Sequence, residues 1–140
     1  MDAERHDVDS PRISRLADKM RDRPDYRSSY VASYTRQFLS RQMREFRGTI
    51  SQSEFGTVIE KQQTVVSRLE DPNYGKWTLQ TLLAIADKLD VAVLVRFVDF
   101  PTFLQATDER SSAAVRPERY DQQKVDDLVS EMQRDDEPRP

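Results

Sequence analysis

Residues 50–70 constrain the fold more than any other segment, because their apolar side chains recur at the spacing of two short helices. Ser51 and Glu54 stand three residues apart, as in a capping box, where each side chain accepts a hydrogen bond from the other residue's backbone N–H. Apolar residues then follow at helical spacing, first at Phe55, Val58 and Ile59, and after a break at Val66 and Leu69. This pattern predicts two short helices joined by a tight turn.

Helical patterns also precede this segment. Ser10-Pro11 is a typical helix start, and apolar residues follow it at Ile13, Leu16, Ala17 and Met20, before Pro24. A second helix is expected from Asp25 or Ser28 to Arg47, where Gly48 ends it. Its stripe is rich in aromatic residues, and we expect Tyr26, Tyr30 and Tyr34 to lie in a core or an interface rather than to form a base-stacking platform.

Two more helices are predicted after residue 70. Thr78 is placed to cap a helix whose apolar face contains Leu79, Leu82, Leu83, Ala86 and Leu89. Residues 121–133 carry Val125, Leu128, Val129 and Met132 on one face, which predicts a short amphipathic helix.

Residues 91–98 differ from the rest, because β-branched side chains dominate them and predict a strand. A lone strand leaves its backbone groups unpaired, so it needs a partner in the chain or in a second subunit. We favour pairing across a dimer twofold, with the dimerisation contacts made by Val91, Val93, Val95 and Phe97.

Length and composition favour one modest cytoplasmic domain of 140 residues. No apolar run is long enough to span a membrane, and the N-terminus lacks the apolar core of a signal peptide. The chain has no cysteine, which excludes disulfides and thiolate metal sites. The net charge is −3, but residues 101–140 hold ten acidic and six basic side chains, so the acidity sits in the tail and does not exclude a nucleic-acid partner.

An exposed polar side on the second of the two short helices suggests a function. Hydrogen-bonding side chains alternate there with the apolar positions, at Gln62, Gln63, Thr64, Ser67 and Arg68. Side chains of these types pair with base edges in the DNA major groove. The alternative is an ordinary solvated helix face.

Residues 29–90 resemble the Xre/Cro-type helix-turn-helix family of phage repressor-like proteins. The most specific portions are Ser-Gln-x-Glu-Phe-Gly at 51–56 and Gln-Thr-Val-Val-Ser-Arg-Leu-Glu at 63–70. The continuation through Asp-Pro-Asn-Tyr-Gly-Lys-Trp-Thr looks like a branch of small bacterial and prophage regulators, some of them antitoxins.

The resemblance implies a mainly α fold, a five-helix helix-turn-helix domain. It would occupy residues 29–90, with an N-terminal helical extension at 1–28, a strand and dimerisation segment at 91–104 and an acidic tail that could hold a short helix at 105–140.

The resemblance also implies DNA contacts. Gln52 would touch a phosphate and brace Gln63, which would contact adenine. Val65 would lie on the exposed side and meet a thymine methyl. The full implied set is Gln52, Lys61, Gln62, Gln63, Thr64, Val65, Ser67, Arg68, Lys76 and Thr78, the last two near backbone phosphate.

Two positions in the motif concern its geometry. Gly56 lies where the two helices cross closely, so only a small residue is expected to fit there. Glu60 stands at the turn position that the family usually gives to glycine, and it would incur a steric cost if its φ is positive.

Other functions find less support. The sole histidine, His6, lies in a tail, and the chain has only three glycines, so we expect no enzyme, no metal and no cofactor. Arg41, Arg44 and Arg47 could form a phosphate-facing ridge, although a solvated face is favoured.

The prediction is a dimeric regulator of transcription, a repressor that binds an inverted repeat in double-stranded DNA. The alternative is an antitoxin that covers a toxin protein with its terminal amphipathic segments, 13–20 and 125–132, although packing of these segments on their own dimer is favoured. A third reading is an adaptor that binds another regulator and no DNA.

Overall fold

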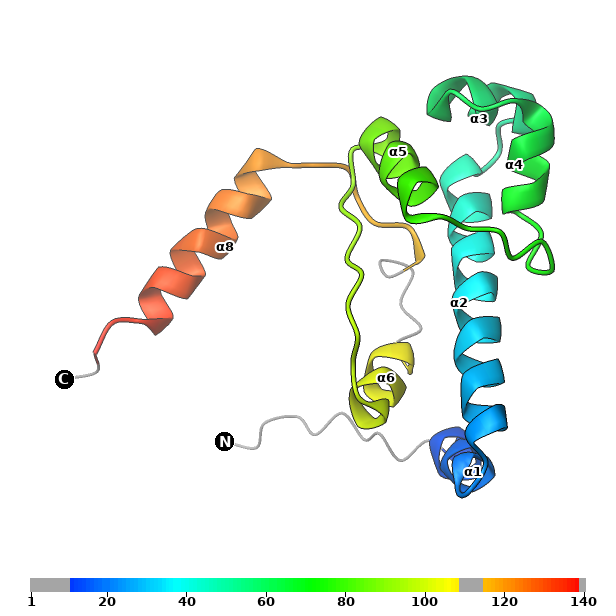
Figure 1. Ribbon diagram of the computed structural model, residues 1–140. Helices are drawn as coiled ribbons and strands as arrows, with labels where there is room; N and C mark the ends of the chain where they lie inside the picture. Colours follow the sequence, from blue (N-terminus) through cyan, green and yellow to red (C-terminus); the bar gives the residue numbers. More distant parts are fainter. Residues whose placement is uncertain (1–10, 109–114, 139–140) are drawn as a thin grey trace.

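The structure, a computed structural model, describes residues 11–108 and 115–138. It is mainly helical, as predicted, with the long helix α2 (Pro24–Arg47) as its axis (Figure 1). The short helix α1 (Pro11–Met20) lies at one end of α2, and the pair α3 (Gln52–Ile59) and α4 (Gln63–Leu69) lies at the other. The predicted start Ser10 falls outside the described residues.

Three helices follow in the chain. Helix α5 (Leu79–Leu89) lies beside α3, an extended segment then leads to α6 (Phe100–Thr107), and α8 (Gln122–Asp135) projects away from the body (Figure 1). None of the described helices has the length and apolar character needed to cross a membrane.

Side chains predicted to start helices do so. Ser51 Oγ accepts a hydrogen bond from the Glu54 N–H at 3.0 Å, and the Glu54 carboxylate accepts one from the Ser51 N–H at 3.2 Å, which completes the capping box. Thr78 Oγ1 accepts from the Thr81 N–H at 3.1 Å at the start of α5. These bonds satisfy N–H groups that the first helical turn leaves unpaired.

The core joins α2, α3, α4 and α5. Its buried members are Met43, Phe55, Ile59, Val66, Leu69 and Ile85. A second cluster lies nearer the other end of α2, where Tyr26, Tyr30, Tyr34 and Phe38 stack in a row and Phe103 of α6 packs edge-on against two of them. The tyrosines therefore belong to intramolecular packing, and burial raises the pKa of the Tyr34 phenol.

The predicted strand at residues 91–98 is not present in the described chain. The segment is extended but forms no ladder, because no other described segment pairs with it. Leu94 and Val95 are 79% and 68% exposed, so the segment is not covered in the single chain.

Helix α6 was not predicted. It begins where the Asp99 carboxylate accepts a hydrogen bond from the Thr102 N–H at 2.9 Å, with Pro101 in the first turn. Both are ordinary helix-start features, but the apolar residues at 100–104 were assigned to the strand region.

Candidate functional site

The predicted site residues gather at the α3–α4 end of the molecule. Helix α4 turns Val66 and Leu69 into the core, so that Gln63, Thr64, Ser67 and Arg68 are exposed on its other side. Gln62 precedes the helix and is exposed, and its side chain makes no cap hydrogen bond. The polar face of the sequence pattern is therefore present as one surface, which we call the α4 face.

Val65 departs from its predicted place. It is only partly exposed and packs against the core cluster, because position 65 lies at the edge of the apolar stripe of α4. Its assignment to the exposed side is corrected.

A hydrogen-bonded chain runs from the core to the α4 face. Arg47 of α2 binds the buried carboxylate of Glu70, with Nη2 to Oε1 at 2.8 Å and Nε to both oxygens at 3.0 and 3.1 Å. Gln52 Nε2 donates to Glu70 Oε2 at 3.3 Å, and Gln63 Nε2 donates to Gln52 Oε1 at 2.8 Å. The exposed amide of Gln63 is thus connected through two partners to an ion pair between α2 and the end of α4.

This chain fixes which atoms of Gln63 remain available. One hydrogen of its NH2 group is donated to Gln52, so the second hydrogen and the carbonyl oxygen stay free to meet a ligand. One donor beside one acceptor is the set that a glutamine amide presents to adenine N7 and N6. Gln52 braces Gln63, as the resemblance implied.

Two of the three arginines on α2, Arg44 and Arg47, have another role than the two that were predicted. Arg44 Nη1 donates to the Glu70 carbonyl oxygen at 2.9 Å, and Arg47 holds the Glu70 carboxylate and donates to the Ile50 carbonyl oxygen at 3.1 Å. Both side chains therefore hold the end of α4, and Arg41 is exposed. Sequence analysis missed this role, because Arg47 and Glu70 lie 23 positions apart.

The turn between α3 and α4 has the geometry expected of it. Glu60 adopts φ 56° and ψ 45°, the left-handed region, and its carboxylate pairs with Lys88 Nζ at 3.2 Å. A Cβ atom on Gly56 would lie 2.5 Å from the Lys61 carbonyl oxygen and 3.5 Å from a methyl of Val66. The turn needs a residue without a side chain at position 56, as predicted.

Around the α4 face the carboxylates are engaged in hydrogen bonds or ion pairs, whereas several cations are not paired with a carboxylate of the described chain. The four carboxylates at residues 51–78 are all engaged, Glu54 in its cap, Glu60 with Lys88, Glu70 with Arg47 and Asp71 with the Asn73 N–H. Within the described residues, no carboxylate forms an ion pair with Lys61, Arg68 or Lys76. The cations of this end therefore remain available to an anionic partner.

Tyr74 brings two of these cations together. The Arg68 guanidinium and the Lys76 ammonium lie 5.8 and 5.9 Å from the centre of its ring. Lys76 and Thr78 are exposed, and the Thr78 hydroxyl caps α5. The loop after α4 thus extends the basic surface toward the start of α5.

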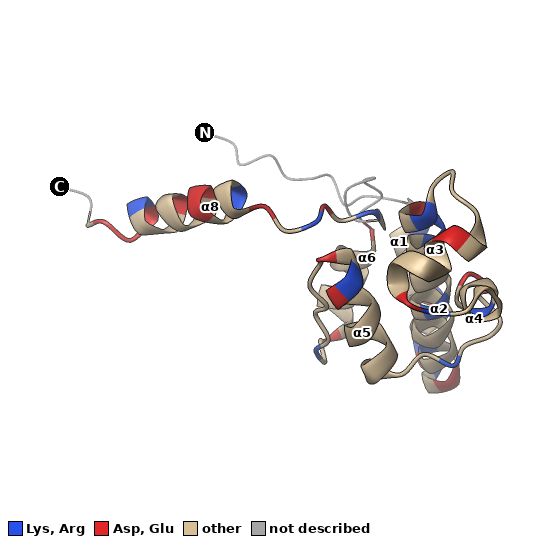
Figure 2. Cartoon of the chain, turned by 90° about the horizontal axis from the view of Figure 1, so that it is seen from above, with Lys and Arg blue, Asp and Glu red and all other residues tan. Residues whose placement is uncertain are grey.

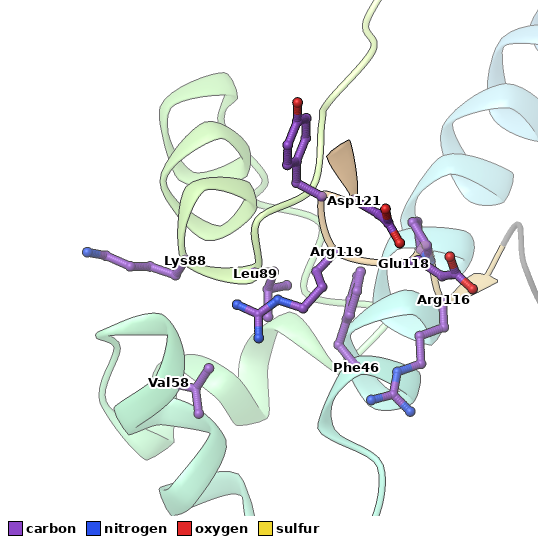
Figure 3. A pocket seen from close by; sticks show the side chains of 10 residues that line it. Phe46, Val58, Lys88, Leu89, Arg116, Glu118, Arg119 and Asp121 are labelled. Atoms are coloured by element: carbon purple, nitrogen blue, oxygen red, sulfur yellow. The ribbon is translucent and has the colours of Figure 1, made fainter. Parts of the chain in front are cut away.

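A pocket of about 540 Å³ lies between α2, α3, α5 and residues 116–121. Phe46, Val58 and Leu89 form its apolar wall, and the side chain of Arg119 lies among them (Figure 3). In the part of the chain that the structure describes, no group of three acidic or histidine side chains could hold a metal ion.

We compared the chain with protein-family models, curated proteins and solved structures. The sequence matches no family model, no curated protein and no solved structure.

Proposed function

We propose that this protein is a sequence-specific regulator of transcription, a homodimeric repressor that inserts the α4 face into the major groove of double-stranded DNA. The observation that carries the proposal is the orientation of Gln63, whose exposed amide is held through Gln52 to the buried carboxylate of Glu70. A solvated surface glutamine has no need of such support. A side chain that reads a base gains from it, because less rotamer freedom is lost on binding.

The residues of the α4 face and its surroundings would make two kinds of contact, some with base edges and some with the DNA backbone. Gln63 would contact adenine, and Thr64 and Ser67 present hydroxyl groups to neighbouring base edges. Arg68 lies within reach of guanine or of phosphate, and Lys61, Lys76 and the start of α5 at Thr78 would meet the DNA backbone. Backbone contacts fix the position of the helix, and base contacts select the sequence.

Charge supports the same partner. The chain is acidic as a whole, at −3, yet the acids near the α4 face are all engaged and three cations are free of carboxylates in the described residues. Affinity for DNA depends on cations placed near phosphates rather than on net charge. A strong dependence of binding on salt is therefore expected.

A dimer completes the proposal. Two copies related by a twofold axis present two α4 faces, which suits an inverted repeat with half-sites about 34 Å apart. The exposed segment 91–98 is the proposed dimer contact, through Val91, Val93, Val95 and Phe97, because pairing between copies would satisfy its backbone. Occupancy of a site that overlaps a promoter would exclude RNA polymerase.

The test uses matched substitutions and DNA selected from random sequences. Gln63→Ala should weaken binding by about 1–3 kcal/mol and relax the preference at one base position. Arg68→Ala, if its contact is to phosphate, should weaken all sequences alike and reduce the salt slope by about one. Gln123→Ala, an exposed glutamine on α8, is the control and should bind as the native chain does. Equal binding by all three variants would overturn the assignment of α4.

An antitoxin is the second candidate, and α8 is the observation that favours it. The N-terminal segment packs within the chain, where Leu16 and Met20 of α1 are buried, so it offers no free apolar face. Helix α8 keeps its apolar residues exposed and could cover part of a toxin. Loss of a co-purified neighbour on deletion of residues 121–140 would support this function. Absence of any DNA shift at low salt would favour an adaptor.

A further inference from the structure

Helix α8 is well formed, but within the described residues its apolar face is left exposed. Asp121 caps it, and Lys124 pairs with Glu118 just before it. Its apolar residues Val125, Leu128, Val129 and Met132 are 39%, 54%, 46% and 61% exposed. A helix of 14 residues is only marginally stable in water without packing. Helix α8 therefore requires a covering surface.

The extended segment 91–98 also lacks a covering surface in the described chain, and in addition it lacks a strand partner there. Its Phe97 side chain is fully exposed, and its backbone has no ladder partner among the described residues. Pairing of two copies would give a two-stranded ribbon, and such a ribbon is marginal in water unless a helix packs against it. The proposed dimer contact is incomplete without a helix.

The two exposed surfaces start from one point. The Tyr120 N–H donates to the Asp90 carbonyl oxygen at 2.8 Å, so the chain entering α8 is bound to the residue that immediately precedes the extended segment. From there α8 and the segment diverge (Figure 1). A hollow of about 450 Å³ lies between them, lined by Asp90, Val91 and Ala92 on one side and by residues 118–121, Lys124 and Val125 on the other.

We propose that the hollow receives the Phe97 end of the 91–98 segment of a second copy, and that α8 of each protomer packs its apolar stripe on the partner's segment. This inference rests on the dimer of the proposed function and adds the element that stabilises it. In an antiparallel pair, residue 91 of one copy lies near residue 98 of the other, so the start of α8 would meet the partner's Phe97.

Dimensions favour a second copy as the occupant. The segment is about 26 Å long and α8 about 21 Å, so one can cover most of the other. Eight residues of the segment alone fall short of the roughly 20–30 residues per side in a stable interface. The apolar stripe of α8 adds four more residues of the same chain to this surface. One chain thus carries both the extended segment and the helix face that would cover it in a second copy.

The first experiment measures dimer dissociation by sedimentation equilibrium of the full chain. The double variant Leu128→Asp/Met132→Asp places charge in the apolar stripe and should raise the dimer dissociation constant by about 100-fold or more. The control Gln123→Asp/Ser130→Asp adds the same charge to the opposite face of α8 and should dimerise as the native chain does. A stripe variant that dimerises normally would overturn the inference.

The second experiment uses the absence of cysteine from the native chain. A Val125→Cys chain and a Phe97→Cys chain are mixed and oxidised, and a disulfide-linked pair of the two should appear on a non-reducing gel. Each variant alone should give little crosslink, because position 97 of one copy lies far from position 97 of the other in an antiparallel pair. Lack of the mixed product would contradict packing of α8 on the partner.

The outcomes separate this inference from the proposed function. If Leu94→Asp/Phe97→Asp abolishes the dimer while the stripe variant and the crosslink show no role for α8, the dimer stands and the inference fails. If the native chain is monomeric, the dimer and the inference fail together, while the Gln63→Ala binding test still decides the DNA contact. If α8 associates only with a co-expressed protein of another kind, the inference fails in favour of that partner.

Discussion

Phe55 in α3 and Phe97 in the extended segment 91–98 show how differently two regions of this chain are built. Phe55 is 2% exposed and lies in the core. The region around it is held together by the capping box of α3 and by the ion pair of Arg47 with the buried Glu70. Phe97 is fully exposed, in a segment whose backbone forms no ladder with another described segment. Helix α8 beyond it carries basic residues near its two ends and acidic residues between them, well away from the body (Figure 2).

The first region is stabilised by contacts within one chain, whereas the second needs contacts with another molecule to bury its apolar side chains. Substitutions near α3 and α4 should change the free energy of unfolding of the chain itself. Substitutions in 91–98 or α8 should change association instead. Four predictions test this division, from the largest effect to the smallest.

Glu70→Ala should cost about 3 kcal/mol in the free energy of unfolding, measured with urea, because it leaves Arg47 without its carboxylate at a largely buried site. DNA affinity should fall as well, since Gln52 and Gln63 lose their support. Glu70→Gln keeps the shape and an acceptor oxygen and should lose less. A loss under about 1 kcal/mol for the alanine variant would show that the ion pair does not hold this end together.

Gly56→Ala should cost about 1–3 kcal/mol, because the new methyl would lie 2.5 Å from the backbone oxygen of Lys61, which cannot move without opening the turn. Thermal unfolding measures the effect. The neighbour Thr57 is exposed, and Thr57→Ala is the matched control in the same helix. Equal melting temperatures for the two variants would mean that the turn adapts.

Glu60→Gly should leave the chain about 0.5–1 kcal/mol more stable, because glycine removes the steric cost of a left-handed residue, less the small contribution of the exposed pair with Lys88. Glu60→Ala separates the two effects, since it loses the pair and keeps the Cβ atom. It should not gain stability. A gain in the alanine variant would assign the cost to charge rather than to the backbone.

Phe97→Ala should change the stability of the dilute chain by less than about 0.5 kcal/mol, because the side chain makes no buried contact in it. At high protein concentration the native chain should melt at a higher temperature than when dilute, and the variant should lose most of that rise. A large loss of stability in the dilute chain would show that Phe97 packs in the core of the single chain, and the contrast with Phe55 would then be wrong.

Local patterns predicted much of this structure. The capping box at Ser51, the cap at Thr78 and the small Gly56 are set by near neighbours in the chain, and all three were predicted. Glu60 was identified as the position where a positive φ would be strained, and its φ is 56°. Helix α8 followed from the spacing of its apolar stripe, and its described bounds, Gln122–Asp135, extend the predicted ones by two residues at the C-terminal end.

Features that depend on distant or absent partners were not predicted. The contact of Arg47 with Glu70 joins residues 23 apart, and neither residue is unusual in its own neighbourhood. The strand at 91–98 was wrong for the single chain because β-branched composition indicates an extended backbone, whereas a strand also needs a partner. Val65 was misplaced because a residue at the edge of a helical stripe can turn either way.

Helix α2 is a single rod of 24 residues, about 36 Å long. Arg44 and Arg47 fasten the α4 end to it, and the stacked tyrosines fasten α6 near its other end. A tilt of about five degrees at the tyrosine end would move the far end by roughly 3 Å. In the proposed dimer, the distance between the two α4 faces, and with it the length of DNA between half-sites, would be set as much by the aromatic packing at one end of this rod as by the residues that touch the bases at the other.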